Sequence, residues 1–352
     1  MNSPISYLKT IVVFLFISCS TITIAQNINF EFAKHSLKPG SKTEILLPVE
    51  TETDSTVIPV TIFNGTKKGP VLGIVAGVHG TEFVPILAAQ QLARDIDPKN
   101  LSGTIILVHI ANVEGFLNRS FRVNPIDQKN LNRVFPGSKN GSMTERIAWT
   151  ISNTIIPNCD YYIDVHAGDY NNDLRAYAGY YNYFDKPVVS KLAKDIAVAM
   201  GFPFVVQFGN EPSLKNKAVY TSREAFIQNI PAIDIECGRK GIVEEKFVIR
   251  IKQALWNVMG YLDMVDQTPP KNEEPVMIGQ RTTISSPETG FFYSDFTSGD
   301  YVKKGMKLGY ITDLFGNHVT DIKCPVDGMI LYKTFNPPIK KGDGLFNIGH
   351  IN

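Results

Sequence analysis

The sequence predicts an α/β domain with a mixed, largely parallel central sheet flanked by helices, followed by a small all-β domain. Short apolar runs alternate with segments of helical periodicity from about residue 70 to residue 264, which is the pattern of strands and helices layered on one sheet. A polar, proline-rich stretch ends that pattern. Beyond it, short β-type runs separated by glycines indicate the second domain.

Residues 1–25 have the features of a secretory signal peptide. Lys9 precedes an apolar run at 10–17, and small residues follow. The run is too short to anchor the chain across a bilayer, so no transmembrane helix is expected in the mature chain. Cleavage after Ala25 would export the protein to the periplasm or the medium. Lipid attachment at Cys19 is the alternative, and we favour cleavage after Ala25.

The composition excludes several classes of protein. The 352 residues are 43% hydrophobic and 20% charged, and 35 basic against 34 acidic side chains give a net charge of +1. Such a chain has no general field that attracts nucleic acid, so no nucleic-acid partner is expected. Its four cysteines form no close-spaced pairs, so a metal site would have to use histidines and carboxylates. The oligomeric state is left open.

The α/β domain is predicted to span residues 26–266. Its β-rich start, at 27–60, is expected to add strands at the edge of the sheet. Ser142 and Glu145 form a capping box that begins one of the helices. Further along, apolar runs predict strands at 71–76, 104–110, 161–165 and 232–235, and helical spacing predicts helices at 82–96, 143–156, 188–200 and 243–264.

Residues 267–275 are predicted to be a linker, because they are polar and contain three prolines. Residues 276–352 are predicted to form the β-rich domain. Its turns at 299–309 and 325–328 are similar to those of biotinyl/lipoyl-type barrel-sandwich modules. No carrier lysine stands at a hairpin tip, so we interpret this domain as structural or gating.

Three candidate metal ligands stand near the ends of predicted strands. His79 and Glu82 lie three residues apart between a strand and a helix, and His166 closes the strand at 161–165. A turn histidine with a capping glutamate, or a core histidine, would produce the same local patterns. Because open α/β sheets bind ligands at the carboxyl ends of their strands, we expect the three side chains to meet at one metal ion.

A carboxylate also ends the predicted strand at 232–235. Glu236 stands at its terminus and Asp234 two residues earlier, so both can face one side of the sheet. Burying a carboxylate is costly unless it has a partner or a catalytic task. Glu236 therefore fits a general base beside the metal, with a salt-bridged structural residue as the alternative. Asp234 is interpreted as structural.

The loop at residues 118–137 carries three arginines and several asparagines, namely Asn118, Arg119, Arg122, Asn124, Asn130, Asn132 and Arg133. Arginine binds carboxylates through two parallel hydrogen bonds and can stabilise an oxyanion. An ordinary solvated loop would have similar polarity. Pro125 and Pro136 favour an ordered conformation.

Together these segments resemble the succinylglutamate desuccinylase/aspartoacylase family, a branch of the zinc carboxypeptidase-like clan. The matching segments occur in order as Gly77-Val-His79-Gly-Thr-Glu82, Asn130-Leu-Asn132-Arg133, Asp164-Val-His166 and Glu236-Cys-Gly238. The family pattern has Asp where this chain has Asn130, and commonly Gly at Gln128. These departures concern the loop rather than the four residues closest to the chemistry.

The resemblance implies a role for each matching residue. His79, Glu82 and His166 would bind a single zinc ion per chain, and Glu236 would be the general base. Arg122 would polarise the scissile carbonyl, with Arg119 close by in the same loop. Asn132 and Arg133 would hold a substrate carboxylate.

The expected function is therefore zinc-dependent hydrolysis of an amide, the deacylation of an N-acyl amino acid or a related small amide that bears a carboxylate. An exported zinc carboxypeptidase-type peptidase acting on peptides or cell-wall fragments is the alternative within enzymes. A non-catalytic binding protein that retains the fold is the alternative of another class, although its usual mark, a lost ligand or base, is absent from the sequence.

Overall fold

The structure is a computed structural model that describes residues 29–209, 219–267 and 274–351. The expected signal peptide, Cys19 and most of the expected linker lie outside the described residues. None of the helices in the described ranges is long and apolar enough to cross a membrane.

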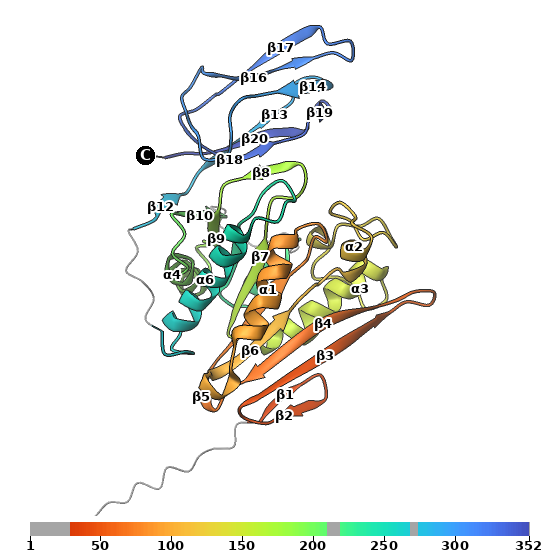
Figure 1. Cartoon of the computed structure of the whole chain (residues 1–352), viewed down its shortest axis with the longest axis vertical. Coiled ribbons are helices and arrows are strands. Elements are labelled where there is room, and N and C mark those ends of the chain that lie inside the picture. Colours follow the sequence, from red (N-terminus) through yellow and green to blue (C-terminus); the bar gives the residue numbers. More distant parts are fainter. Residues whose placement is uncertain (1–28, 210–218, 268–273, 352) are drawn as a thin grey trace, which may run out of the picture.

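A nine-stranded mixed sheet lies at the centre of the larger domain (Figure 1). Neighbouring strands are antiparallel in β9/β11, β4/β6 and β3/β4 and parallel elsewhere. The predicted fold class is confirmed, and the β-rich start supplies the edge strands. In spatial order the strands are β12 (Val276–Ile278), β10 (Phe204–Phe208), β9 (Tyr177–Tyr181), β11 (Ala232–Glu236), β7 (Tyr161–His166), β5 (Lys67–Ala76), β6 (Ser102–Val108), β4 (Ser55–Asn64) and β3 (Ser41–Glu50).

Helices cover both faces of this sheet. One core contains side chains of α1, α4 and α6, and the other contains side chains of α3 and α5. Within β5, Leu72 and Ile74 face the first core and Val75 the second, which explains why central strands appear as unbroken apolar runs. The helices are α1 (Phe83–Asp95), α2 (Val113–Leu117), α3 (Met143–Thr150), α4 (Pro187–Ala199), α5 (Thr221–Ile227) and α6 (Glu245–Tyr261). The capping box at the start of α3 is confirmed.

The β domain consists of two antiparallel sheets around a core of its own. One sheet contains β13 (Arg281–Ser285), β20 (Gly344–Gly349), β18 (Gly328–Thr334) and β15 (Tyr301–Val302). The other contains β17 (His318–Lys323), β16 (Lys307–Thr312), β14 (Gly290–Tyr293) and β19 (Pro338–Ile339). A separate hairpin of β1 (Phe30–Phe32) and β2 (His35–Leu37) lies near the other end of the molecule (Figure 1).

Each of the two domains contributes one strand to a sheet of the other. The first residues after the expected linker, β12, pair with β10 and extend the α/β sheet rather than the β domain. In return, β8 (Asn172–Leu174) leaves the α/β domain to pair with β18. The β domain therefore lies directly against the segment that follows β7 (Figure 1).

Candidate active site

The four residues expected closest to the chemistry meet at one edge of the sheet. Strands β5, β7 and β11 are adjacent and parallel, so their carboxyl ends lie side by side. His79 and Glu82 follow the end of β5, His166 ends β7, and Glu236 ends β11. The register between β7 and β11 places Glu236 opposite His166.

Two glycines shape the turn that carries His79 and Glu82. Gly77 has φ +68°, a left-handed conformation that favours glycine. A Cβ on Gly80 would lie 2.1 Å from the carbonyl carbon of Gly115, so any side chain there would collide with the backbone of α2. Glycine at both positions lets the chain turn sharply between β5 and α1.

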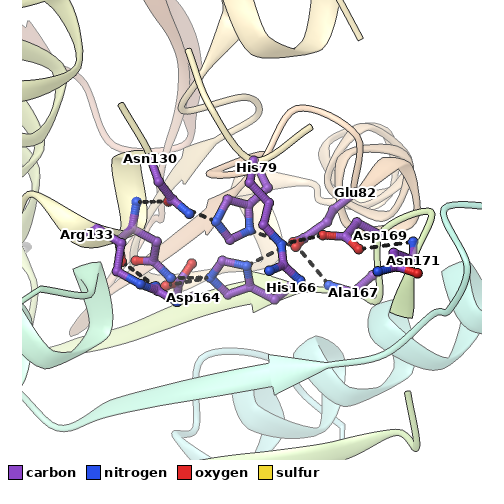
Figure 2. A network of polar contacts seen from close by, with 11 residues as sticks. His79, Glu82, Asn130, Arg133, Asp164, His166, Ala167, Asp169 and Asn171 are labelled. Carbon is purple, nitrogen blue, oxygen red and sulfur yellow. Dashed lines mark hydrogen bonds and ion pairs between the residues drawn. The ribbon is translucent and has the colours of Figure 1, made fainter. Parts of the chain in front are cut away.

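The two candidate histidine ligands both contact the carboxylate of the third ligand, Glu82 (Figure 2). His79 Nδ1 lies 2.7 Å from Glu82 Oε1, and His166 Nδ1 lies 2.9 Å from Glu82 Oε2. All three residues are buried, and one donor atom from each lies within 4.8 Å of the others. His79, Glu82 and His166 thus form a compact group that can hold a metal ion.

Electrostatics inside this group are strong. Burial alone would raise the pKa of Glu82, but His79 and His166 outweigh it and hold that pKa well below its ordinary value. Burial alone would lower the pKa of His166, but Asp164 and Glu82 outweigh it and raise that pKa well above the ordinary value. The carboxylate is therefore kept in its charged form, the form that a metal ion requires.

The outward nitrogens of both rings face acceptors that the sequence analysis did not assign to this role. His79 Nε2 lies 3.1 Å from Asn130 Oδ1, and His166 Nε2 lies 3.0 Å from Asp164 Oδ2. Such partners orient ligand rings and fix which nitrogen carries the proton. Asp164 could have been found from its position two residues before His166, on the same strand face.

Glu236 is a partly buried carboxylate at the end of β11. Its Oε2 atom is buried and has no hydrogen-bond partner within the described part of the chain. Burial raises the pKa of Glu236 to about 8, against the opposing effect of His166. Asp234 lines the same cavity, and burial, together with Asp164, raises its pKa to about 7.

The arginine loop also reaches the site, and the structure distinguishes between its candidates. Arg122 lines the cavity, whereas Arg119 is exposed and outside it. Arg133 donates to the backbone oxygen of Asn132 at 2.7 Å and packs over the Tyr220 ring. The Asn132 amide nitrogen lies 3.2 Å from His166 Nε2, and its oxygen accepts from a backbone amide at the start of α5. Asn132 therefore contacts protein groups while it lines the cavity.

A cavity of about 720 Å³ brings these residues together. Part of its lining was not predicted from the sequence, namely Tyr181, Tyr183, Phe208, Tyr220, Arg223 and Arg281. Arg281 begins β13 and is therefore a contribution of the β domain. Arg133, Arg223 and Arg281 make no ion pair with a carboxylate in the described ranges. Unpaired arginines in a cavity suit an anionic ligand.

The His-Glu-His group, the Glu236 carboxylate and several arginines share one cavity at the carboxyl ends of the strands. Together with the fold, this arrangement is that of a class of hydrolase. The chain belongs to the succinylglutamate desuccinylase/aspartoacylase family, since residues 68–262 match the model of its catalytic domain. This is a family of amide deacylases. The resemblance drawn from the sequence is thereby confirmed.

Similar proteins are spread over several bacteria. The N-alpha-acetyl-L-2,4-diaminobutyric acid deacetylase of Halomonas elongata is 24% identical over 310 residues, which cover 86% of this chain and 88% of that protein. A succinylglutamate desuccinylase/aspartoacylase structure from Rhodobacter sphaeroides has a TM-score of 0.80 at 20% identity, covering 92% of this chain and 98% of its own. The product-bound ectoine utilization protein EutE (DoeB) from Ruegeria pomeroyi has a TM-score of 0.79 at 24% identity, covering 88% of this chain and 95% of its own.

Proposed function

We propose that this protein is a zinc-dependent amidohydrolase that deacylates an N-acyl amino acid or a related small amide bearing a carboxylate. The observation that carries the proposal is the position of Glu236 opposite His166 in the sheet, beside the three-ligand group. Glu236 is partly buried, and its buried Oε2 atom has no hydrogen-bond partner among the described residues. A site that only bound a ligand would have no need of this second carboxylate.

The donor set fits zinc. Two imidazole nitrogens and one carboxylate are a common ligand set of catalytic zinc, which keeps one position open for water or substrate. The Nδ1 atoms of His79 and His166 both face Glu82. The Nε2 atom of His79 faces Asn130, and the Nε2 atom of His166 faces Asp164. When bound, the ion would supply Lewis-acid activation of water and of the scissile carbonyl.

The side chains of this chain supply the remaining steps. Glu236 accepts a proton from the attacking water and later delivers it to the leaving nitrogen. Arg122 stabilises negative charge on the former carbonyl oxygen as the tetrahedral centre forms. Arg133 binds the substrate carboxylate, which orients the amide toward Glu236.

An exported peptidase acting on peptides or cell-wall fragments is the competing enzyme function. The Halomonas relative is named for deacetylation of an amino-acid derivative, which supports the deacylase. Turnover of N-acyl amino acids and of short peptides should be compared, each with and without a chelator. Faster turnover of peptides would favour the peptidase, and turnover of neither by zinc-loaded protein would favour a binding protein.

Arg133→Ala is expected to raise KM for carboxylate-bearing substrates about 10- to 100-fold, since hydrogen bonds to charged groups contribute roughly 1.5–3 kcal/mol. The carboxamide analogue of the same substrate should lose much less affinity. Arg119→Ala is the matched control, because Arg119 lies in the same loop but is exposed outside the cavity. Equal loss for acid and amide substrates would contradict the carboxylate-binding role of Arg133.

Export is also part of the proposal, supported by the features of residues 1–25 alone. Expression in a bacterial host should place the mature protein in the periplasm or medium, with Gln26 as its first residue by N-terminal sequencing. Incorporation of labelled lipid that disappears in Cys19→Ser would identify the anchored form instead. Protein that stays in the cytoplasm and retains residues 1–25 would contradict both cleavage after Ala25 and lipid attachment at Cys19.

A further inference from the structure

Arg122 makes its ion pair with a residue outside the group described so far. Its Nε donates to Asp169 Oδ2 at 2.7 Å. Asp169 is fully buried, whereas about a third of the Arg122 side chain is exposed. The pair uses only the Nε edge of the guanidinium, so the two amino groups remain available to a ligand in the cavity that Arg122 lines.

Arg122 has an unusual backbone conformation beside this contact. Arg122 has φ +59°, a left-handed conformation that is strained for a non-glycine residue and persists where the surroundings enforce it. The preceding Phe121 ring packs edge-on against Tyr170, with ring centroids 4.4 Å apart. Two consecutive loop residues are thus held by two consecutive residues, Asp169 and Tyr170.

The β domain holds the other side of the 169–174 segment. Asn171 accepts from Phe335 N at its backbone oxygen, at 2.8 Å, and from Asn336 N at its side-chain oxygen, at 2.9 Å. The backbone amide of Asn171 in turn lies 3.3 Å from Asp169 Oδ1. A continuous path of polar contacts therefore leads from the β domain through Asn171 and Asp169 to Arg122.

Two further contacts fix the same segment. β8 pairs with β18 through Asn172, Asp173 and Leu174. Asp173 Oδ1 also accepts from Ser298 Oγ at 3.1 Å, and Ser298 belongs to the β domain. The segment is therefore an added strand of a β-domain sheet at one end and the support of Arg122 at the other.

We propose that Asp169 is a positioning residue that aims Arg122 at the oxyanion, and that the β domain fixes Asp169 through the segment 169–174. This inference rests on the role given to Arg122 in the proposed function. It assigns the β domain a task in catalysis without placing any of its residues on the reacting atoms.

A double-mutant cycle on kcat tests the proposal, using Arg122→Ala, Asp169→Asn and the double variant with zinc loaded. Removing one oxyanion donor costs about 10²–10³-fold in rate, so that loss is expected for Arg122→Ala. Asp169→Asn is expected to lower kcat roughly 10-fold or more, but by no more than Arg122→Ala does. The double variant should be no slower than Arg122→Ala. Multiplying losses would overturn the positioning role.

A rescue experiment adds a measurement that a purely structural role would not affect. Free guanidinium ion should partly restore the rate of Arg122→Ala, because Asp169 remains to bind it in place of the missing group. It should restore nothing in the double variant. Equal rescue in both backgrounds would overturn the inference. If Arg122→Ala instead keeps the full rate, the proposed role of Arg122 fails, which is a distinct outcome.

Asn171→Ala tests the contribution of the β domain if Asp169→Asn does not fold. Loss of the contact between Asn171 and Asn336 is expected to lower kcat several-fold in protein that retains Arg122. The same loss should have no effect in the Arg122→Ala background. Asn347→Ala is the matched control and should leave the rate unchanged, because the Asn347 side-chain amide donates to Thr283 inside the β domain. An equal loss from Asn171→Ala in both backgrounds would overturn the proposed path.

Discussion

Glu236→Gln is expected to lower kcat by about 10²–10⁴-fold, the usual contribution of a positioned general base, with the metal content unchanged. Glutamine keeps the size of the side chain but cannot accept the proton of the attacking water. The three ligands do not include Glu236, so the ion should stay bound. Single-turnover rates measured together with zinc content separate the two effects.

Asp234→Asn is the matched control for that experiment. Asp234 lies on the same strand and lines the same cavity, but Glu236 is the residue opposite His166. We expect Asp234→Asn to change kcat by less than about 10-fold, below the range of a lost base. A large loss for Asp234→Asn with an unchanged rate for Glu236→Gln would transfer the base role to Asp234. Loss of zinc from Glu236→Gln would make Glu236 a ligand.

The sequence predicted those parts of the fold that local patterns define. Strands β5, β6, β7 and β11 are buried on both faces and were visible as apolar runs, and the capping box marked the start of α3. Strands β9, β10 and β12 of the nine-stranded sheet were missed. β9 is the tyrosine- and glycine-rich run Tyr177–Tyr181, and β12 has three residues, two of them exposed. Their strand character comes from pairing with β10, which no local signal contains.

The residues of the candidate site likewise differ in whether the sequence could predict their positions. The ligands and Glu236 could be located because strand ends of a parallel sheet converge, so position along the chain implied position in space. The choice of Arg122 over Arg119, and the partnership of Arg122 with Asp169, could not be derived. The two arginines stand three residues apart and both have a left-handed backbone conformation. The ion pair of Arg122 with the buried Asp169 and its place in the cavity lining distinguish it from Arg119.

Asn130 shows how a departure from the family pattern acquires a physical meaning. Its side-chain oxygen lies 3.1 Å from His79 Nε2 and also accepts from the backbone amide of Asn132. An asparagine there keeps the acceptor that orients the His79 ring but removes the negative charge that an aspartate would add. The departure thus alters the charge behind one ligand rather than the ligand set, a position where substitutions change metal affinity.

Removal of the metal is expected to abolish activity, and zinc alone should restore it. Dialysis against a chelator followed by addition of zinc should recover the full rate at one zinc ion per chain. Glu82→Ala removes the carboxylate that both histidines face and should prevent this recovery. Rate and zinc content, measured on the same samples, check the result. Activity that survives complete removal of zinc would contradict the proposed function.

Thermal unfolding distinguishes a lost ligand from a damaged fold. A ligand at 1,000 times its Kd stabilises the folded state by about 4.1 kcal/mol, so zinc should raise the Tm of the unmodified protein. Glu82→Ala should show no such rise, because one of three ligands is gone. Glu44→Ala, which removes an exposed carboxylate that pairs with Lys42, should keep both the rise and the activity. A full zinc-dependent rise in Glu82→Ala would mean that the ion binds elsewhere and that the His79–Glu82–His166 group is not its site.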